Sequence, residues 1–245
     1  MNTMISPPEP ATPVALHPFL RRLQANAFDR LNIRDHTVDL AGWVNEGFDS
    51  TLDHVLDVFQ EKRGVVIMEV GSWKGASANR IAARCRARCV DLNALVCIDT
   101  WLGAPEFYTW GLDDETRGGA LRPFDGYPSV FYTFTKNTKS SGHHDVVVPF
   151  PISSLQAAEV LRHYGIKADA IYVDGSHESN AVYMDLLTFH EVLGDGGLMW
   201  GDDYSENWPG VQQAVNLFAE EKGLDLVVIG VNWILRKRSL FVRIP

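Results

Sequence analysis

Cysteine is scarce in this chain of 245 residues, which contains only Cys85, Cys89 and Cys97. An odd and sparse set of cysteines does not build a disulfide framework, and it indicates reduced thiols in the cytoplasm. Cys85 and Cys89 lie one helical turn apart, but no further ligands follow at a metal-binding spacing. We therefore interpret them as small core residues.

Long apolar runs and positive charge are also lacking. No stretch approaches the roughly 18 apolar residues of a membrane span, and the polar, proline-bearing N-terminus does not resemble a signal peptide. The 22 Lys and Arg residues stand against 31 Asp and Glu residues, which gives a net charge of −9. This balance argues against a nucleic-acid backbone as the partner.

The order of the remaining patterns predicts an α/β fold with one large domain. Short apolar runs alternate with helical patterns, which is typical of a mainly parallel sheet with helices on both faces. The predicted strands cover residues 65–70, 94–100, 144–149, 170–173, 196–201, 226–229 and 233–236, with a further β segment at 240–244.

The predicted helices each present one apolar face. The helix after the first strand, at about 75–88, would bury Ala78, Ile81, Ala82, Cys85 and Cys89. A capping-box pattern of Ser153 and Gln156 opens a helix whose face would be Leu155, Ala158 and Leu161. The last two helices would bury Val182, Leu186, Phe189 and Leu193, and then Val211, Ala214, Val215 and Phe218.

The first 62 residues are expected to form a separate N-terminal part. Met1–Pro13 carries four prolines and is typical of a disordered tail. Helical patterns at 17–31, 37–43 and 51–62 would then cap the sheet or build the interface of a homo-oligomer. Residues 63–245 would form the main domain, which contains the predicted sheet.

An insertion at 101–142 interrupts the alternation between the second and third strands. It carries nine aromatic residues, together with Arg117, Arg122 and the Gly118–Gly119 pair. A small helical subdomain that packs its own aromatic residues would explain this composition. We favour a lid and substrate pocket at the carboxyl edge of the sheet, because the insertion directly follows Asp99.

The stretch Val65–Gly75, VVIMEVGSWKG, predicts a buried strand, a tight turn and a helix start. Gly71 would let the backbone approach a ligand closely, and the first N–H groups of the helix would face the same crevice. An ordinary strand–helix turn fits the same residues, so this stretch alone does not establish a cofactor site.

Acidic residues follow every one of the central strands except the third. Glu69, Asp99, Asp174 and the Asp202–Asp203 pair lie at strand ends, which is the edge where open α/β sheets bind ligands. Single acids at such positions are common as caps and turn residues. Five on one edge would repel each other, and a divalent cation is the simplest counter-charge. His177 shares a loop with Asp174 and could act as a base or a ligand.

Four stretches together resemble the class I S-adenosylmethionine-dependent methyltransferases. They are EVGSWKG at Glu69–Gly75, VCIDTW at Val96–Trp101, IYVDGSHE at Ile171–Glu178 and GGLMWGDDY at Gly196–Tyr204. Their order and spacing are similar to those of the bacterial metal-dependent sugar O-methyltransferases and the cephalosporin-hydroxylase-like proteins. The resemblance covers roughly residues 65–218 and implies a Rossmann-like, seven-stranded sheet. Trp73 departs from the commonest pattern of the class, which has a glycine there.

The resemblance also implies a role for each matching residue. Glu69, Gly71, Ser72 and Gly75 would hold the methionine part of S-adenosylmethionine, Asp99 would accept hydrogen bonds from the ribose, and Ser153 or Ser154 would lie near the adenine. Asp174, Asp202 and Asp203 would hold Mg²⁺ or Mn²⁺, and His177 would be the general base. The implied reaction is O-methylation of a small molecule such as a sugar or natural product, assisted by the metal, which lowers the pKa of the hydroxyl.

Two other functions remain open. An NAD-type oxidoreductase would also use Asp99 on a ribose, but the G-x-G-x-x-G fingerprint is missing and the clustered acids would have no role. A non-catalytic protein that keeps the methyltransferase fold is the other alternative.

Overall fold

The structure is a computed structural model, which describes residues 13–28, 38–39, 44–109, 119–121 and 126–237. Its centre is a seven-stranded sheet in the order β3-β2-β1-β4-β5-β7-β6. The strands are β1 Val65–Val70, β2 Leu92–Asp99, β3 Val147–Pro151, β4 Ala168–Val173, β5 Leu193–Gly201, β6 Leu224–Ile229 and β7 Asn232–Lys237. The first five are parallel, and β7 runs antiparallel between β5 and β6. The predicted mainly parallel sheet of seven strands is confirmed.

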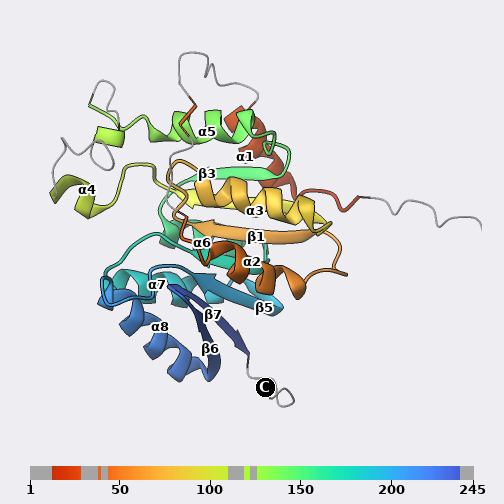
Figure 1. Cartoon of the computed structure of the whole chain (residues 1–245). Helices are drawn as coiled ribbons and strands as arrows, with labels where there is room; N and C mark the ends of the chain where they lie inside the picture. Colours follow the sequence, from red (N-terminus) through yellow and green to blue (C-terminus); the bar gives the residue numbers. More distant parts are fainter. Residues whose placement is uncertain (1–12, 29–37, 40–43, 110–118, 122–125, 238–245) are drawn as a thin grey trace, which may run out of the picture.

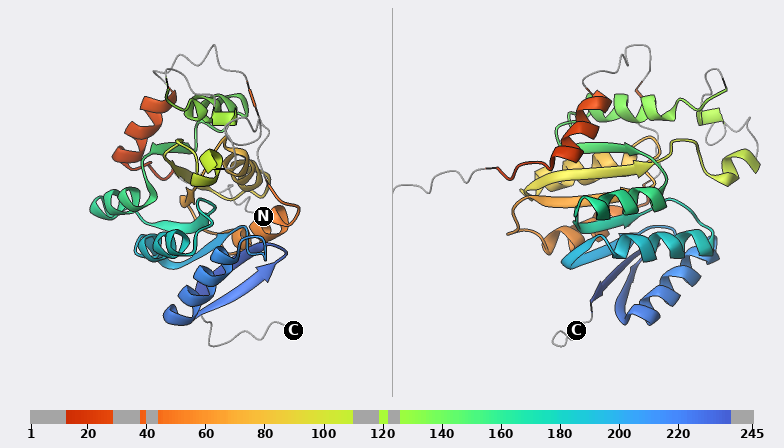
Figure 2. Two further views of the ribbon diagram at one scale, coloured as in Figure 1. Left: turned by 90° about the vertical axis from the view of Figure 1, so that its left-hand side faces the viewer. Right: turned by 180° about the vertical axis from the view of Figure 1, so that it is seen from behind.

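Helices cover both faces of this sheet (Figures 1 and 2). The α-helices are α1 Pro18–Phe28, α2 Phe48–Asp57, α3 Ala76–Ala87, α4 Pro105–Thr109, α5 Val130–Ser140, α6 Ser154–His163, α7 Ser179–His190 and α8 Pro209–Lys222, and a short 3₁₀ helix, η1, covers Gly119–Leu121. Helices α2, α3 and α5 pack with one buried cluster, and α6, α7 and α8 pack with the other. In the described part of the chain, no helix is long and apolar enough to cross a membrane.

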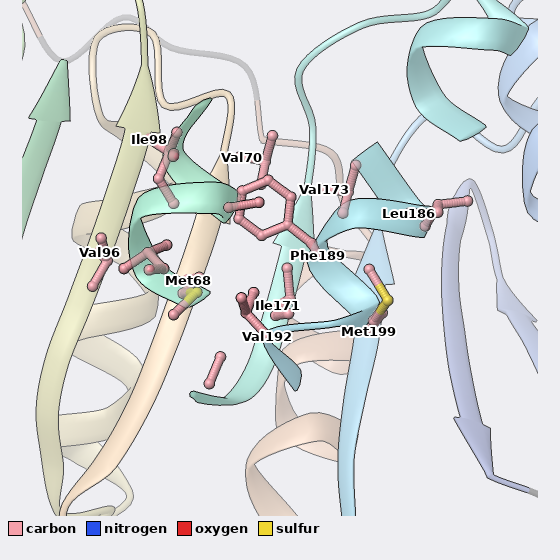
Figure 3. Packing of buried hydrophobic residues seen from close by; sticks show 14 of the residues in the cluster. Met68, Val70, Val96, Ile98, Ile171, Val173, Leu186, Phe189, Val192 and Met199 are labelled. Carbon is pink, nitrogen blue, oxygen red and sulfur yellow. The ribbon is translucent and has the colours of Figure 1, made fainter. Parts of the chain in front are cut away.

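The two faces of β1 explain this layering. Val65 and Ile67 belong to the cluster under α2 and α3, whereas Met68 and Val70 belong to the cluster under α6, α7 and α8. Side chains alternate along a strand, so a continuous apolar run is what a strand needs when both faces are covered. Figure 3 shows the second cluster, in which Phe189 of α7 lies among side chains of the parallel strands.

Three residues that were predicted to lie on buried helix faces lie elsewhere in the structure. Leu155 is exposed, and the buried face of α6 is Ala157, Ala158 and Leu161. Cys89 is also exposed, because α3 ends at Ala87 and the chain turns with a positive φ at Cys89. Leu193 begins β5 instead of lying on α7. The predicted inward residues of α8 are all buried, and Gly223 ends that helix in the left-handed conformation.

The N-terminal helices pack directly on the sheet. Helix α1 contacts β3, and α2 fills the cluster beside α3. The second predicted helix, at 37–43, lies mostly outside the described residues, as do the expected tail at 1–12 and the expected β segment at 240–244. Helix α2 begins and ends a few residues earlier than predicted.

Candidate active site

The insertion splits into two structural parts. Its C-terminal helix, α5, belongs to the core, because Val130 and Phe134 are fully buried. Its N-terminal helix, α4, contributes Glu106 and Phe107 to the wall of a large cavity. Arg117, Gly118 and Arg122 lie outside the described residues. Helix α5 therefore packs with the core and α4 borders the cavity, while the role of the insertion as a lid over a substrate stays a prediction.

The cavity lies at the carboxyl edge of the parallel strands and has a volume of about 870 Å³. Seven of the predicted site positions line it, and they come from all of the loops that the motifs mark. They are Gly71, Ser72, Asp99, Asp174, His177, Asp202 and Asp203. Ser154, the alternative to Ser153, lines the cavity as well.

The other predicted cofactor residues lie behind the cavity wall. Glu69 is fully buried beneath the turn, on the face of β1 that α3 covers. Gly75 begins α3 with φ +85°, and a Cβ there would lie 2.9 Å from the ring of Phe134. Ser153 is the N-cap residue of α6, as predicted, but its side chain makes no cap hydrogen bond to the backbone. Its hydroxyl donates instead to Gln156 Oε1 over 2.9 Å, so the predicted capping box is not formed.

At Gly71 the backbone of the site comes very close to the backbone of the neighbouring strand end. Its φ is +88°, and a Cβ at this position would lie only 2.2 Å from the carbonyl oxygen of Asp174. The amide of Gly71 donates to Ile98 O, and the amide of Asp174 donates to Val70 O, so three adjacent strands are joined here. Any side chain would force these strand ends apart, which explains the glycine in this turn.

Asp99 organises the turn that follows Gly71. Its Oδ2 accepts hydrogen bonds from the amides of Ser72 and Trp73 at 2.9 and 2.8 Å, and its Oδ1 accepts from the amide of Trp101 at 2.7 Å. Burial raises the pKa of Asp99, and these backbone donors oppose the rise. The carboxylate expected to bind the ribose therefore also shapes the turn.

Two tryptophans beside Asp99 adopt an unusual backbone conformation. Trp73 and Trp101 have φ values of +44° and +53°, which bulky residues rarely adopt. The indole of Trp101 donates to the carbonyl oxygen of Trp73 over 2.7 Å. These contacts stabilise the strained turn. They explain how a tryptophan can occupy position 73, where the commonest pattern of class I methyltransferases has glycine.

Glu69 is a buried carboxyl group without hydrogen-bond partners of ordinary geometry. Neither carboxylate oxygen has a hydrogen-bond partner of ordinary geometry. Burial raises the pKa of Glu69 to about 7, and the nearby polar groups of Ser72, Ser77 and Cys97 offset only part of this effect. A buried carboxylate directly under a ligand-binding turn can interact with a cationic group of the ligand.

His177 lies between two carboxylates. Its Nδ1 is 2.9 Å from Oε1 of Glu106, and its Nε2 is 2.9 Å from Oδ2 of Asp203. The ring of Trp208 stacks on the imidazole, with centroids 3.9 Å apart. Burial lowers the pKa of His177, but Asp203 and then Glu106 outweigh it, so that the pKa is raised. The two carboxylates therefore favour the protonated form of the imidazole in this arrangement.

The acids after β4 and β5 come close together. Burial raises the pKa of Asp174 well above its usual range, and the charges of Asp202, Asp203 and Glu69 raise it further. Asp202 accepts a hydrogen bond from the amide nitrogen of the Asn45 side chain over 2.6 Å, and Trp233 donates to its backbone carbonyl. Asp203 adopts φ +61°, which Asp tolerates better than most residues.

These acids match a hard cation in chemistry but are not arranged around one. Their mutual repulsion and their oxygen donors suit Mg²⁺ or Mn²⁺. Asp174 accepts from the hydroxyl of Tyr172 and Asp203 contacts His177. In the part of the chain that the structure describes, no group of three His, Cys, Asp or Glu side chains is placed to hold a metal ion.

The residues present do fit S-adenosylmethionine. The cavity is large enough for a nucleoside joined to an amino acid, and its floor is a glycine turn that no side chain obstructs. The unpaired carboxylate of Glu69 lies under that turn.

Sequence analysis missed several residues of this site. Glu106 lies in an insertion that matched no motif, and Asn45 lies in the N-terminal part. Trp208 lies in the cavity wall directly before α8, at a position for which the sequence predicted no role. Asp185 interrupts the apolar face of α7, and that interruption was the signal that could have revealed it.

Comparison with known proteins agrees with this architecture. A family model described as "Methyltransferase domain" matches residues 68–204, more than half of the chain. A comparison with curated protein sequences gave no significant match.

Solved structures of methyltransferases are similar over most of the chain. The calicheamicin methyltransferase CalS11 is 15% identical, with a TM-score of 0.54, and the match covers 91% of this chain and 94% of that one. The O-methyltransferase NovP is also 15% identical, with a TM-score of 0.54 and coverages of 90% and 98%. An O-methyltransferase from Bacillus cereus, solved in complex with SAH, is 12% identical, with a TM-score of 0.53 and coverages of 91% and 93%. At these identities the likeness concerns the fold.

Proposed function

The chain belongs to the methyltransferase-domain family, and from that premise we propose that it transfers the methyl group of S-adenosylmethionine to a hydroxyl of a small molecule such as a sugar or natural product. The observation that carries the proposal is the placement of His177 in the wall of the cavity, between Glu106 and Asp203. An imidazole held at the carboxyl edge is suited to take a proton from a hydroxyl.

Bound S-adenosylmethionine supplies a methyl group on a sulfonium, which an oxygen nucleophile attacks in line. The turn at Gly71 and Ser72 would hold the amino-acid part of the cofactor, and Asp99 would accept hydrogen bonds from the ribose through its remaining lone pairs. Glu69 would lie beneath the cationic part. Orientation of the two reactants by such fixed groups lowers the barrier substantially.

His177 would remove the hydroxyl proton as the bond to the methyl group forms. Only the neutral imidazole can accept a proton, and its remaining N–H needs a partner. We assign that partner to Glu106 at Nδ1, which leaves Nε2 to face the acceptor once the hydroxyl replaces Asp203. Trp208, stacked on the ring, would keep the imidazole in that plane.

The proposal also includes assistance of the methyl transfer by a divalent metal ion. Asp174, Asp202 and Asp203 would hold Mg²⁺ or Mn²⁺, which would lower the pKa of the acceptor hydroxyl. The concentration of negative charge supports this assignment. It requires the side chain of Asp203 to leave His177, which is the same movement that frees Nε2 for the acceptor.

The proposed partner is a small hydroxyl compound, and no nucleic acid or membrane is part of the proposal. The excess of acidic residues supports this choice. We also propose that the enzyme works in the cytoplasm and that the N-terminal helices provide the interface of a homo-oligomer.

Thermal-shift measurements with S-adenosylhomocysteine, NAD and Mg²⁺ test the proposal first, because a ligand stabilises the folded protein that binds it. We expect stabilisation by S-adenosylhomocysteine and none by NAD. Mass spectrometry of candidate sugars and phenolic natural products, incubated with enzyme and S-adenosylmethionine, then detects methyl transfer. Stabilisation by NAD alone would favour an oxidoreductase. Cofactor binding without transfer to any hydroxyl, amine or thiol acceptor would favour a non-catalytic protein.

A further inference from the structure

The turn between β1 and α3 has a strained backbone that neighbouring residues must hold in place. Gly71, Trp73 and Gly75 have positive φ values of +88°, +44° and +85°, and only the two glycines adopt this region without steric cost. A bulky residue keeps such a conformation only where its surroundings enforce it. We call residues 71–75 the cofactor turn, because Gly71 and Ser72 line the cavity.

One carbonyl group of the cofactor turn is held by the insertion. The carbonyl oxygen of Lys74 accepts a hydrogen bond from Nδ2 of Asn137 on α5 over 2.8 Å, and this bond is buried. Asn137 lies 63 positions further along the chain, and neither residue lines the cavity. The carbonyl oxygen of Trp73, one position earlier, accepts from Trp101, which also belongs to the insertion. The conformation of the turn therefore depends on residues outside the cavity wall.

Asn137 also holds a short piece of the N-terminal part. Its Oδ1 accepts from the amide of Asp39 over 2.9 Å, and its Nδ2 donates to the carbonyl oxygen of Asp39 over 2.6 Å. The ammonium of Lys74 lies 2.9 Å from Oδ2 of Asp39, and these side chains are only 8% and 17% exposed. We call Asp39, Lys74 and Asn137 the polar node. It joins the N-terminal part, the cofactor turn and α5, which are far apart in the sequence.

The contacts of the polar node favour one arrangement of the three segments. Asn137 is fully buried, and its amide uses its oxygen and its nitrogen in the three hydrogen bonds described. A buried polar group that loses its partners is strongly destabilised, because water does not replace them. Displacement of Asp39 would remove two partners of Asn137 and the counter-charge of Lys74. We therefore expect the cofactor turn and the segment at Asp39 to be ordered together.

We propose that Asn137 is a positioning residue of the cofactor site, and that it makes tight binding of S-adenosylmethionine depend on the docking of the segment at Asp39. This inference rests on the proposed function. Asn137 acts through the carbonyl group of Lys74, which fixes the turn that presents Gly71 to the cavity. The ligand binds the fraction of molecules in which the turn is correctly shaped, so the apparent affinity falls with that fraction. Such coupling is reciprocal, so bound cofactor also holds Asp39 in place.

Calorimetry with S-adenosylhomocysteine tests this inference in Asn137→Ala. The dissociation constant should rise about tenfold or more, which corresponds to a correctly shaped fraction of about one tenth. Lys74→Met removes the ion pair but keeps the backbone carbonyl, and it should also weaken binding. Val130→Ala is the control, because it truncates a fully buried side chain of the same helix outside the polar node. It should lower the melting temperature and leave the dissociation constant unchanged. An equal loss of affinity in this control would overturn the inference.

Hydrogen exchange, detected by NMR in the wild-type protein, is a second test that needs no variant. Saturating S-adenosylhomocysteine should slow exchange of the Asp39 amide about tenfold or more, although Asp39 does not line the cavity. The amide of Gly223, at the far end of α8, should exchange at an unchanged rate. An unchanged rate at Asp39, or undiminished affinity in Asn137→Ala, would overturn this inference and leave the polar node as a docking contact alone. Absence of S-adenosylhomocysteine binding to the wild-type protein would instead overturn the proposed function, and this inference with it.

Discussion

The buried carboxylate of Glu69 should make the stability of the cofactor-free protein fall as the pH rises. Glu69 is fully buried, neither oxygen has a partner of ordinary geometry, and burial raises its pKa from 4.5 to about 7. Glu69→Gln keeps the size and shape of the side chain and removes its titration. The variant therefore isolates the cost of ionising this one group.

The size of the effect follows from the difference between the two pKa values. Below pH 4.5 the carboxyl is protonated in both states and costs nothing. Between 4.5 and 7 the unfolded chain releases the proton while the folded protein retains it, so the free energy of unfolding falls with pH. Above 7 both states are ionised and the loss is complete. The interval of 7 − 4.5 = 2.5 pH units corresponds to about 3 kcal/mol.

Urea unfolding at pH 5 and pH 8, without cofactor or metal, measures this prediction. The stability of Glu69→Gln relative to the wild-type protein should rise by about 2 to 3 kcal/mol between these pH values, somewhat less than over the whole interval because the loss has already begun at pH 5. The comparison at each pH cancels raised carboxyls that do not interact with Glu69, such as Asp202, because both proteins contain them. Glu220→Gln on the exposed side of α8 is the matched control and should show no such change. A relative stability of Glu69→Gln that does not depend on pH would refute the reasoning.

Three further predictions concern cofactor, metal and base. Gly71→Val should abolish binding of S-adenosylhomocysteine, because its Cβ would lie 2.2 Å from Asp174 O. Asp99→Ala should weaken that binding about tenfold or more. Calorimetry that shows undiminished affinity in both variants would contradict the placement of the cofactor at these residues. Chelation, or Asp174→Ala, should abolish turnover while circular dichroism shows a folded protein, whereas full turnover in excess chelator would exclude a required metal. His177→Ala should lower kcat about a hundredfold and leave cofactor affinity intact. Wild-type activity should be lost as the pH falls and His177 becomes protonated, because only the neutral imidazole accepts a proton. An alanine variant with normal kcat and the same pH profile would remove His177 from the mechanism.

The strands were the most predictable part of this fold. The run Val65–Val70 was predicted with its observed ends, because both faces of β1 are covered and its apolar residues are continuous. Gly223 ends α8 in the left-handed conformation, which favours glycine, so a glycine after a helical pattern is a readable sign of a helix end. Leu155 was misassigned because an apolar residue at helical spacing does not reveal whether it faces the core or a cavity.

The site was predictable only where residues lie at strand ends in recognisable motifs. Gly71, Asp174 and the pair after β5 could be placed because the carboxyl ends of parallel strands share one edge. Glu106 could not, because its contact with His177 joins residues 71 positions apart, and no pattern in the insertion indicates that contact.

The position of β7 has a consequence for how the enzyme is made. This strand lies between β5 and β6, although it follows both in the chain. Its Trp233 is fully buried against Gly201, and the indole donates to the carbonyl oxygen of Asp202 over 3.1 Å. During synthesis from the N-terminus, β5 and the acids after it therefore emerge from the ribosome before their pairing strand. That strand, β7, is translated about thirty residues later. Until then the edge of β5 is open to pairing with other chains, so expression of the protein should depend on the speed at which this last stretch is translated and folded.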